Sequence, residues 1–408
     1  VIKEVIVEKP AARPGVRLRM TGPTGDKSFY DEYFELTGVE IDIIDQPYAA
    51  VYQSMLINLS QANSTFDLVH MDDPWLPQFT KFLADLDPLW QANGWPFPDP
   101  DFVPAIANLA DYPPGEYGIR GVPHIGNVQS YSYRKDLLEE LGIERPKTWD
   151  DVLAFAKAVV DAKAPDTYGY AIRGQPGNPA MTSFLPILRG YGVDVVDAGL
   201  QPQVNTPEGH AALEMVIELK NLAPPGVENI GHAELGKLMY TGKTAQSGDT
   251  WPDQLLKMYN PELTDVMGLV DAGAEPSQPG VEPANMTGCW FMGIPAGSEH
   301  KEEAADFIHW LTSPENQKRS MMVNNWPPAR YSLLQDPELL EKFPFLPGLQ
   351  AAGEVAMPRP RTAHYSIIED IVGRHVSAVI AEQESVEKAA ELADKEVIDA
   401  LTDKGAYE

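Results

Sequence analysis

Four tryptophans stand beside polar residues where extended segments are expected to end. The groups are Asp72 and Asp73 with Trp75, Asp249 with Trp251, Gly288 with Trp290, and Asn325 with Trp326. An indole ring can stack on the apolar C–H face of a sugar while neighbouring carboxylates and amides hydrogen-bond its hydroxyls. For any single tryptophan, packing in a core is at least as common, and Asp72 and Asp73 are equally suited to capping a helix. The shared setting of the four favours a carbohydrate-binding role for the group.

The sequence carries no signature of an enzyme. Gly190 and Gly192 begin like a dinucleotide-binding loop, but Val195 stands where its third glycine belongs. The eight histidines lack the spacing of metal ligands on one helix face. Among 60 Asp and Glu residues, some pair could always flank a glycosidic bond, so carboxylates alone say little. We therefore expect no catalysis, no cofactor and no bound metal.

The segment Gly242-Lys243-Thr244 resembles the end of a phosphate-binding loop. That motif needs a glycine where Lys237 stands, and it needs the order strand, loop, helix. Here the pattern predicts a helix, a turn and then a strand that ends near Trp251. The sequence therefore excludes a nucleotide site at this position.

The elements that must position these residues form an alternating pattern in the first part of the chain. Strands are predicted at 16–20, 39–44 and 65–70, with helices from about 26 to 38 and at 48–59 between them. This order predicts right-handed crossovers and a parallel sheet. Ligands of such sheets bind past the carboxyl ends of the strands, where residues 21–26 and 72–75 lie.

An extended segment at 118–134 leads to a second α/β region. Helices are predicted at 135–141, 151–162 (capped by Thr148), 181–188, 208–222 and 252–259, and strands at 168–172 and 266–270. Residues 275–283 form a connector rich in proline and glycine, and 288–295 form a further strand. A long helix at 386–402 ends the pattern. The sequence therefore predicts two lobes rather than one.

The composition excludes several classes of partner. The 408 residues carry a net charge of −29, which repels nucleic acid and anionic lipid surfaces. The sequence contains no apolar run of the ~18 residues that a spanning helix needs. One cysteine, Cys289, cannot form an internal disulfide. Residues 1–14 read as a stalk, and the start Val1-Ile2-Lys3-Glu4 suggests a chain that has already been trimmed.

Six stretches occur in an order that is typical of one family. They are residues 67–75 (DLVHMDDPW), 121–138 (GVP to YSYRKDLL), 141–150, 242–251, 290–297 and 304–317 (AADFIHWLTSPENQ). In these stretches the chain resembles the extracellular, periplasmic-type solute-binding proteins of bacterial carbohydrate ABC importers, family 1. The resemblance covers nearly everything after residue 15, and the segments around YRKD and FIHWLTSPE are its most specific parts.

The resemblance implies a type II periplasmic-binding-protein fold. This is an α/β fold of two lobes, each a mostly parallel sheet flanked by helices, joined by hinge crossovers. Lobe 1 is then expected at 15–126 and 280–329, and lobe 2 at 127–279 and 330–408. The hinge is expected near 123–134, 275–283 and 326–332.

The resemblance also implies which residues contact the solute. Asp72 would accept hydrogen bonds from hydroxyls, with Asp73 beside it, and Trp251 and Trp290 would stack on sugar rings. Asn127 takes a position where the family often has an acid. Cys289 stands where it often has glycine, which puts close backbone approach there in doubt. The remaining expected contacts are Gln129, Arg359, Arg361 and Asp26, with the segment 178–183 adding contacts from the second lobe.

The function that the resemblance implies is binding of a neutral mono- or oligosaccharide in a cleft between two lobes that close on it. The protein would then deliver the sugar to the permease subunits of an ABC importer. It would act as a monomer outside the cell or in the periplasm, tethered by an N-terminal lipid anchor that this chain lacks.

Three alternatives stay open. The first is a polyol, or a phosphorylated or amino-acid-like solute, on the same architecture. An anionic solute would need several clustered Arg or Lys near the cleft, and among the residues expected there only Arg359 and Arg361 stand close together in sequence. The second is a glycoside-active enzyme, and the third is a structural surface protein without a small ligand.

Overall fold

The computed structural model describes residues 10–23, 25–61 and 64–407. The chain divides into two compact units, and neither is continuous in sequence. Unit 1 contains residues up to Asn127, Gly288–Asp336 and Arg361–Ala363. Unit 2 contains Val128–Thr287, Pro337–Pro360 and the chain from His364 onward. The prediction of a stalk at 1–14 falls largely outside the described residues.

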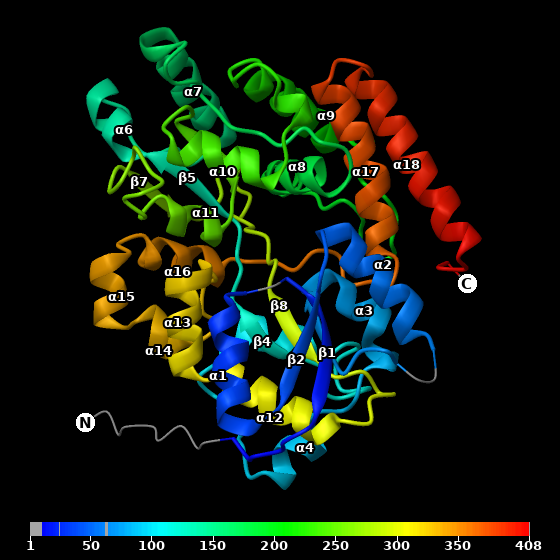
Figure 1. Cartoon of the computed structure of the whole chain (residues 1–408). Helices are drawn as coiled ribbons and strands as arrows, with labels where there is room; N and C mark the ends of the chain where they lie inside the picture. The colour runs from blue at the N-terminus through cyan, green and yellow to red at the C-terminus, as the bar shows by residue number, and fades with distance from the viewer. Residues whose placement is uncertain (1–9, 24, 62–63, 408) are drawn as a thin grey trace. The chain divides into compact units, whose positions relative to one another are not determined.

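Unit 1 is built on a five-stranded mixed sheet with the order β2-β1-β3-β8-β4 (Figure 1). The strands are β1 (Arg17–Gly22), β2 (Glu40–Asp45), β3 (Leu68–Asp72), β4 (Val122–Ile125) and β8 (Trp290–Gly293). β1 pairs in parallel with β2 and β3, as predicted. β8 lies antiparallel between β3 and β4, so the other four strands share one direction and the sheet is mostly parallel, as predicted, with β8 as the exception.

The direction of β8 follows from where the chain leaves and re-enters unit 1. The chain leaves after β4 at Asn127 and returns before β8 at Gly288. The Gly288 N–H donates to the Asn127 carbonyl at 2.9 Å. The chain leaves the sheet at the end of β4 and returns to it at the start of β8, and this hydrogen bond joins the two places. β4 and β8 therefore run in opposite directions.

The helices of unit 1 cover the sheet and connect its strands. The helices and short 3₁₀ turns (η) are α1 (Lys27–Thr37), α2 (Tyr48–Leu59), η1 (Asp73–Trp75), α3 (Leu76–Phe79), η2 (Thr80–Phe82), α4 (Asp87–Ala92), α5 (Pro104–Ala107), η3 (Asn108–Ala110), α12 (Lys301–Leu311), α13 (Pro314–Asn324) and α14 (Tyr331–Leu334). One hydrophobic cluster holds them together, with Tyr33, Phe291 and Phe307 among its buried members.

Unit 2 has a three-stranded sheet with the order β6-β5-β7. The strands are β5 (Ser130–Arg134), β6 (Gln246–Thr250) and β7 (Val270–Gly273), and both pairings are antiparallel. The predicted mostly parallel sheet of this lobe is therefore wrong for these strands. The segment predicted as a strand at 168–172 does run parallel to β6, but only through an isolated bridge, Tyr168 to Thr244, and adjacent hydrogen bonds.

Unit 2 is mostly helical. Its helices and one 3₁₀ turn are α6 (Lys135–Leu141), α7 (Trp149–Lys163), α8 (Asn178–Gly190), α9 (Pro207–Lys220), η4 (Val227–Asn229), α10 (His232–Tyr240), α11 (Pro252–Lys257), α15 (Pro337–Lys342), α16 (Leu346–Glu354), α17 (Tyr365–Ile380) and α18 (Val386–Asp403). Thr148 and Asp151 form the capping box that starts α7, as predicted. Figure 1 shows α17 and α18 side by side, and both contribute to the core of this unit.

The chain passes between the units at 127/128, 287/288, 336/337, 360/361 and 363/364. The predicted lobe boundaries, 15–126 with 280–329 and 127–279 with 330–408, stay predictions.

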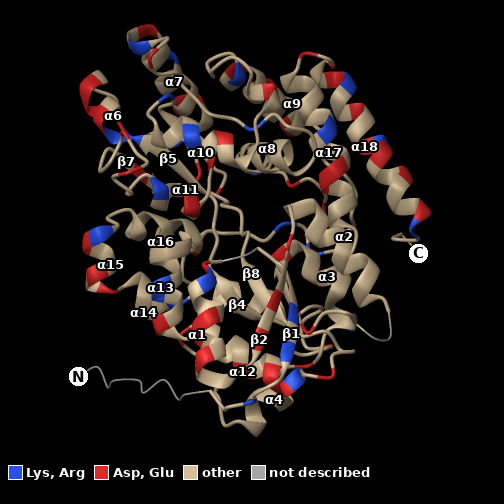
Figure 2. Cartoon of the chain, in the orientation of Figure 1, with Lys and Arg blue, Asp and Glu red and all other residues tan. Residues whose placement is uncertain are grey.

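Charged side chains are distributed over both units, and acidic ones are more frequent (Figure 2). Helix α18 carries both signs along its length (Figure 2). Within the described ranges, no helix is long and apolar enough to cross a membrane.

Candidate ligand-binding site

The two acids at the end of β3 are held by defined partners in unit 1. Asp72 accepts a hydrogen bond from the Tyr48 hydroxyl at 2.7 Å and one from the Asp73 N–H at 3.0 Å. The carboxylate of Asp73 accepts the Cys289 N–H at 3.0 Å, and the Asp73 N–H also donates to the Cys289 carbonyl at 2.9 Å. Asp72 thus caps the turn η1, the alternative that the sequence left open, and Asp73 joins β3 to the start of β8.

Aromatic rings gather at the same end of unit 1. We name this group the aromatic cluster: Tyr48, His70, Trp75, His124, Trp290 and Trp326. Trp290 is central, with ring centroids 5.6 Å from Trp75 and 5.3 Å from His70. Trp75, His70 and His124 are buried, whereas Tyr48, Trp290 and Trp326 are partly exposed. The exposed rings are therefore the ones that can present a face to a solute.

The two histidines of the cluster were not predicted as site residues. Burial lowers the pKa of His124 to about 3. Burial, and then the neighbouring His124, lower the pKa of His70 well below its usual range. Both rings are therefore neutral at pH 7. His70 could have been found from the alternation in β3, because it shares a face with Asp72.

Two other predicted residues of unit 1 hold the crossing segments together. The carbonyl of Asn127 accepts the Gly288 N–H and the Cys289 thiol, the latter at 3.2 Å. Arg361 donates to the carbonyls of Asp73 at 2.9 Å and Leu109 at 2.6 Å, and its guanidinium lies 5.1 Å from the centre of the Tyr112 ring. Arg361 therefore anchors residues 361–363 to unit 1.

Asp26 is the N-cap of α1. Its carboxylate accepts the Ser28 N–H at 2.9 Å and also the Ser28 hydroxyl. These two hydrogen bonds, the hydroxyl first, hold the pKa of Asp26 below its usual range. The side chain is exposed, and its contacts are those of a helix cap.

In unit 2 the polar residues converge on Asp249, near the end of β6. Arg173 donates to both carboxylate oxygens, at 2.5 Å from Nε and 2.6 Å from Nη2. Ser183 and Gln129 each donate at 2.6 Å, and the Trp251 indole N–H donates at 3.0 Å. The side chains of Arg173 and Asp249 are only 4% and 2% exposed. This buried ion pair is fully hydrogen-bonded on its carboxylate side, and no pattern in the sequence indicates the participation of Arg173.

The structure gives Trp251 and Arg359 protein partners. Trp251 is a member of the hydrophobic core cluster of unit 2, which is the packing alternative that the sequence left open. Arg359 is buried in unit 2 with its guanidinium 3.9 Å from the carboxylate of Glu369. Glu369 also accepts the Asn178 amide at 2.9 Å. Their predicted contact with solute stays a prediction.

Several buried polar atoms near the crossing segments have no hydrogen-bond partner among the described residues. They are His124 Nε2 and Asn127 Oδ1 in unit 1, and Gln129 Oε1 and Thr287 Oγ1 in unit 2. The Gln129 amide orientation is fixed, because its Nε2 donates to the Thr182 carbonyl at 2.8 Å and to Asp249. Most buried polar atoms in proteins have a partner. In each unit, two such atoms are therefore open to a hydrogen bond from an external molecule.

Glu275 of unit 2 also has buried polar atoms without hydrogen-bond partners within the described chain, and it was not predicted as a site residue. Neither carboxyl oxygen has a hydrogen-bond partner in the described part of the chain. Burial, and then the charge of Asp249, raise the pKa of Glu275 well above its usual range. The carboxyl group packs against Gly248, where an added Cβ would lie 2.8 Å from Glu275 Oε2. Burial therefore favours the neutral form of the Glu275 carboxyl group, which lies against β6.

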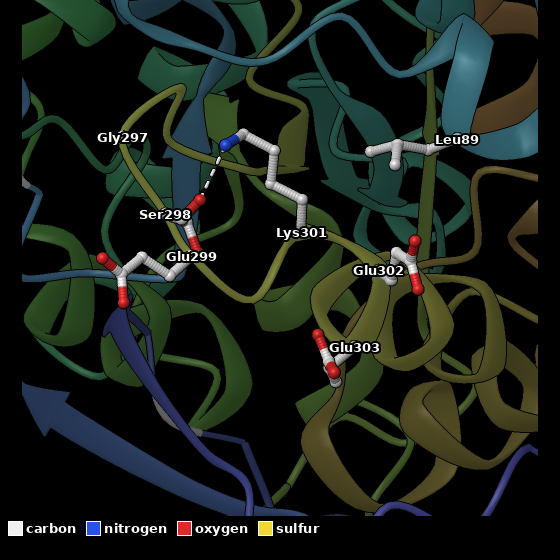
Figure 3. Close-up of a pocket in the computed structure, with 7 residues that line it drawn as sticks. All are labelled: Leu89, Gly297, Ser298, Glu299, Lys301, Glu302 and Glu303. Carbon is white, nitrogen blue, oxygen red and sulfur yellow. Dashed lines mark hydrogen bonds between the residues drawn. The ribbon is translucent and has the colours of Figure 1, made fainter.

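A surface depression elsewhere in unit 1 is separate from these residues. It has a volume of ≈ 750 Å³, and its lining includes Glu299, Lys301 and Glu303 (Figure 3). Ser298 in its wall donates to Asp67 at 2.6 Å, which precedes β3. The depression therefore lies at the amino-terminal end of β3, opposite Asp72. Within the described ranges, no group of His, Cys, Asp and Glu is arranged to hold a metal ion.

Comparison with known proteins identifies what this arrangement is similar to. The family described as bacterial extracellular solute-binding protein matches residues 21–318. A probable amino-acid ABC transporter periplasmic-binding protein of Sinorhizobium fredii is 25% identical over 393 residues, covering 93% of this chain and 88% of that protein.

Two solved structures agree with the fold. An ABC transporter solute-binding protein from Agrobacterium radiobacter K84, in complex with ribitol, has a TM-score of 0.87 at 25% identity, covering 95% of this chain and all of that one. The maltose-bound T. maritima MalE3 has a TM-score of 0.84 at 26% identity, with the same coverage. The predicted two-lobed fold is confirmed by these matches, apart from the antiparallel strand pairings of unit 2. With the family matched over most of its length, this chain belongs to the bacterial extracellular solute-binding proteins.

Proposed function

We propose that this protein binds a neutral sugar or polyol outside the cell or in the periplasm and delivers it to an ABC importer. The observation that carries the proposal is the set of partnerless buried atoms at the crossing segments. The amide oxygens of Asn127 and Gln129 are acceptors, the Thr287 hydroxyl can donate or accept, and the role of His124 Nε2 depends on its tautomer. A polyhydroxylated solute supplies many O–H donors, whereas an anion supplies only acceptors. The ligands of the two solved relatives, ribitol and maltose, are solutes of this kind.

The partly exposed rings of the aromatic cluster would bind the apolar faces of the solute. Residues of both units contact it in this proposal: Trp290 and Asp72 from unit 1, and Gln129 from unit 2. The lobes close when the solute binds, which shifts a population of open molecules toward the closed form. The protein acts as a monomer, binds without turnover, and presents the closed form to the permease.

The direct test is a thermal-shift screen of the pure protein with mono-, di- and oligosaccharides and polyols. A solute that binds only the native state raises the melting temperature by mass action. A rise with one chemically related group supports the proposal, and reducing-sugar release from that group would replace it with a glycosidase. A flat response to all of them, together with a rise for an amino acid, would contradict it.

Binding of an amino acid is the second candidate function, because the Sinorhizobium relative is named as a probable amino-acid ABC transporter periplasmic-binding protein. An amino acid brings a carboxylate and an ammonium group, which need opposite charges. Asp249 lies in β6, and its buried carboxylate pairs with the buried guanidinium of Arg173. This pairing favours the neutral solute.

Replacing Trp290 with alanine is expected to weaken solute binding by about 1–3 kcal/mol, the scale known for stacking on an aromatic side chain. Titration calorimetry with the solute found in the screen measures this loss. Trp290→Phe should retain part of the affinity because a ring remains.

The matched control is Trp95→Ala, which removes a partly exposed tryptophan of the same unit. Trp95 stacks on His309 with ring centroids 3.9 Å apart, away from the aromatic cluster. Equal affinity for Trp290→Ala and the unmodified protein would remove Trp290 from the site.

A further inference from the structure

Helix α8 contains a proline that changes how one of its carbonyls is used. Pro186 lies inside α8, four positions after Thr182. In an α-helix the carbonyl of one residue accepts from the N–H four positions later. Proline has no N–H, and its ring pushes against the carbonyl four positions earlier. The Thr182 carbonyl instead accepts from a side chain, because Nε2 of Gln129 donates to it at 2.8 Å.

The second acceptor of the Gln129 amide is Asp249 on β6. Nε2 of Gln129 donates to Oδ1 of Asp249 at 2.6 Å, and the Trp251 indole N–H donates to the same oxygen at 3.0 Å. Arg173 donates to both carboxylate oxygens, from Nε and from Nη2. Guanidinium and indole N–H groups can only donate, so both oxygens of Asp249 act as acceptors.

These two contacts fix the direction of the Gln129 side chain. An amide nitrogen carries two N–H donors, and the Thr182 carbonyl and the Asp249 carboxylate each take one. The reversed amide would turn Oε1 toward two acceptors. The backbone is fixed as well, since the Gln129 N–H donates to the Met286 carbonyl at 2.9 Å and its carbonyl accepts the Asn285 amide at 2.8 Å. Oε1 of Gln129 is thus held as an acceptor.

This oxygen lacks the donor that a buried acceptor needs. Gln129 is 0% exposed, and none of the described residues donates a hydrogen bond to its Oε1. A buried acceptor without a donor destabilises the state that contains it, so most such atoms in proteins are paired. The missing partner is therefore a donor group from outside the chain.

We propose that Oε1 of Gln129 accepts a hydrogen bond from a hydroxyl of the solute, and that Gln129 is a specificity-determining residue. This inference rests on the proposed function and deepens it. Asp249 and Thr182 are positioning residues, because they hold the amide nitrogen and leave the oxygen for the solute. The arrangement requires an O–H donor at this point. It rejects an ionised carboxylate or an ether oxygen there, because two acceptors would face each other.

The first measurement compares the affinity of the protein for a solute and for analogues in which fluorine replaces one hydroxyl at a time. The solute is ribitol, D-mannitol or maltose, whichever raises the melting temperature. Fluorine is similar in size to a hydroxyl but cannot donate. At the position that faces Gln129, the fluorinated analogue should bind about 10- to 100-fold more weakly. Equal affinity for the solute and all of its fluorinated analogues would overturn the inference.

The second measurement repeats this series with Gln129→Met, which keeps a side chain of similar length without an amide. Its affinity for the solute should fall, and the loss caused by fluorine at that one position should disappear, because the two groups no longer interact. Gln201→Met changes an exposed glutamine of the same unit and should keep the loss. A loss of unchanged size in Gln129→Met would show that another residue accepts from this hydroxyl, and the inference would be wrong.

Circular dichroism checks the fold of both variants, and NMR decides if Gln129→Met is unfolded. In the unmodified protein, the side-chain carbonyl ¹³C resonance of Gln129 should shift when the solute is added. The analogue with fluorine at the critical position should shift it less. A resonance that does not move with the solute would contradict the inference, since a water molecule would then be the partner.

The outcomes separate this inference from the proposed function. If the unmodified protein binds a sugar or polyol and Gln129→Met binds the solute and its analogues in the same way, the inference fails and the proposed function stands. If the unmodified protein binds no sugar or polyol at all, the proposed function fails, and the assignment of a solute hydroxyl to Gln129 fails with it.

Discussion

Asp249→Asn is expected to lower the free energy of unfolding by about 3–5 kcal/mol, the usual result of breaking a buried ion pair. The change keeps the shape of the side chain but leaves the guanidinium of Arg173 buried without a counter-charge. It also weakens the hydrogen bonds from Gln129 and Ser183 that converge on the same carboxylate. Urea unfolding followed by circular dichroism measures the change.

Two further variants make this prediction specific. Asp265→Asn removes an exposed carboxylate of the same unit and should change stability by less than about 0.5 kcal/mol. The double variant Arg173→Leu with Asp249→Leu removes both charges, so it should be more stable than Asp249→Asn alone. If the double variant shows the sum of two independent losses instead, the ion pair is not the cause.

Glu275→Gln is expected to stabilise the protein at neutral and alkaline pH. In the folded state the pKa of this carboxyl is raised above its unfolded value by burial and by Asp249. A raised acid pKa means that the folded state holds its proton more tightly, so stability is highest below the unfolded pKa. Stability then falls by up to about 1.4 kcal/mol per pH unit as the pH rises toward the folded pKa. Glutamine stays neutral and removes this loss.

The measurement is the free energy of unfolding of both proteins between pH 4 and pH 9. The two curves should meet near the ordinary carboxyl pKa and separate above it, with the glutamine variant more stable. Glu262→Gln serves as control, because it makes the same change in net charge at an exposed position of unit 2. Parallel curves for Glu275→Gln and Glu262→Gln would show that Glu275 ionises freely.

The parts of the fold that the sequence predicted are those with strong local patterns. Helices α2 and α6 have the predicted bounds, because apolar spacing and a terminal glycine or polar residue define them locally. Helix α17 was missed, although its residues 365–380 contribute to the core of unit 2. The direction of β8 was not predictable from a strand pattern, because it depends on where the chain re-enters unit 1.

The predicted solute contacts stay predictions, and the protein contacts of these residues could be predicted only in part from the sequence. Asp72 is the last residue of β3 and Trp290 the first residue of β8, and the sequence pattern predicts a strand near each of them. The pairing of His70 with His124 joins residues 54 positions apart, and the pairing of Arg173 with Asp249 spans 76. No spacing rule connects such residues. Trp251 shows a second limit, since a tryptophan that packs in a core and one that stacks on a sugar have the same local pattern.

The place of β8 in the sheet of unit 1 also sets an order of events during synthesis. β3 pairs with β1 on one side and with β8 on the other, whereas β4 is joined to the sheet only through β8. Residues 128–287, which build most of unit 2, are translated before β8 emerges from the ribosome. The part of unit 1 that is synthesised first therefore has unpaired strand edges until β8 is made. Unpaired strand edges promote aggregation of folding intermediates. The second unit can assemble most of its core in that interval, although its helices α17 and α18 follow last.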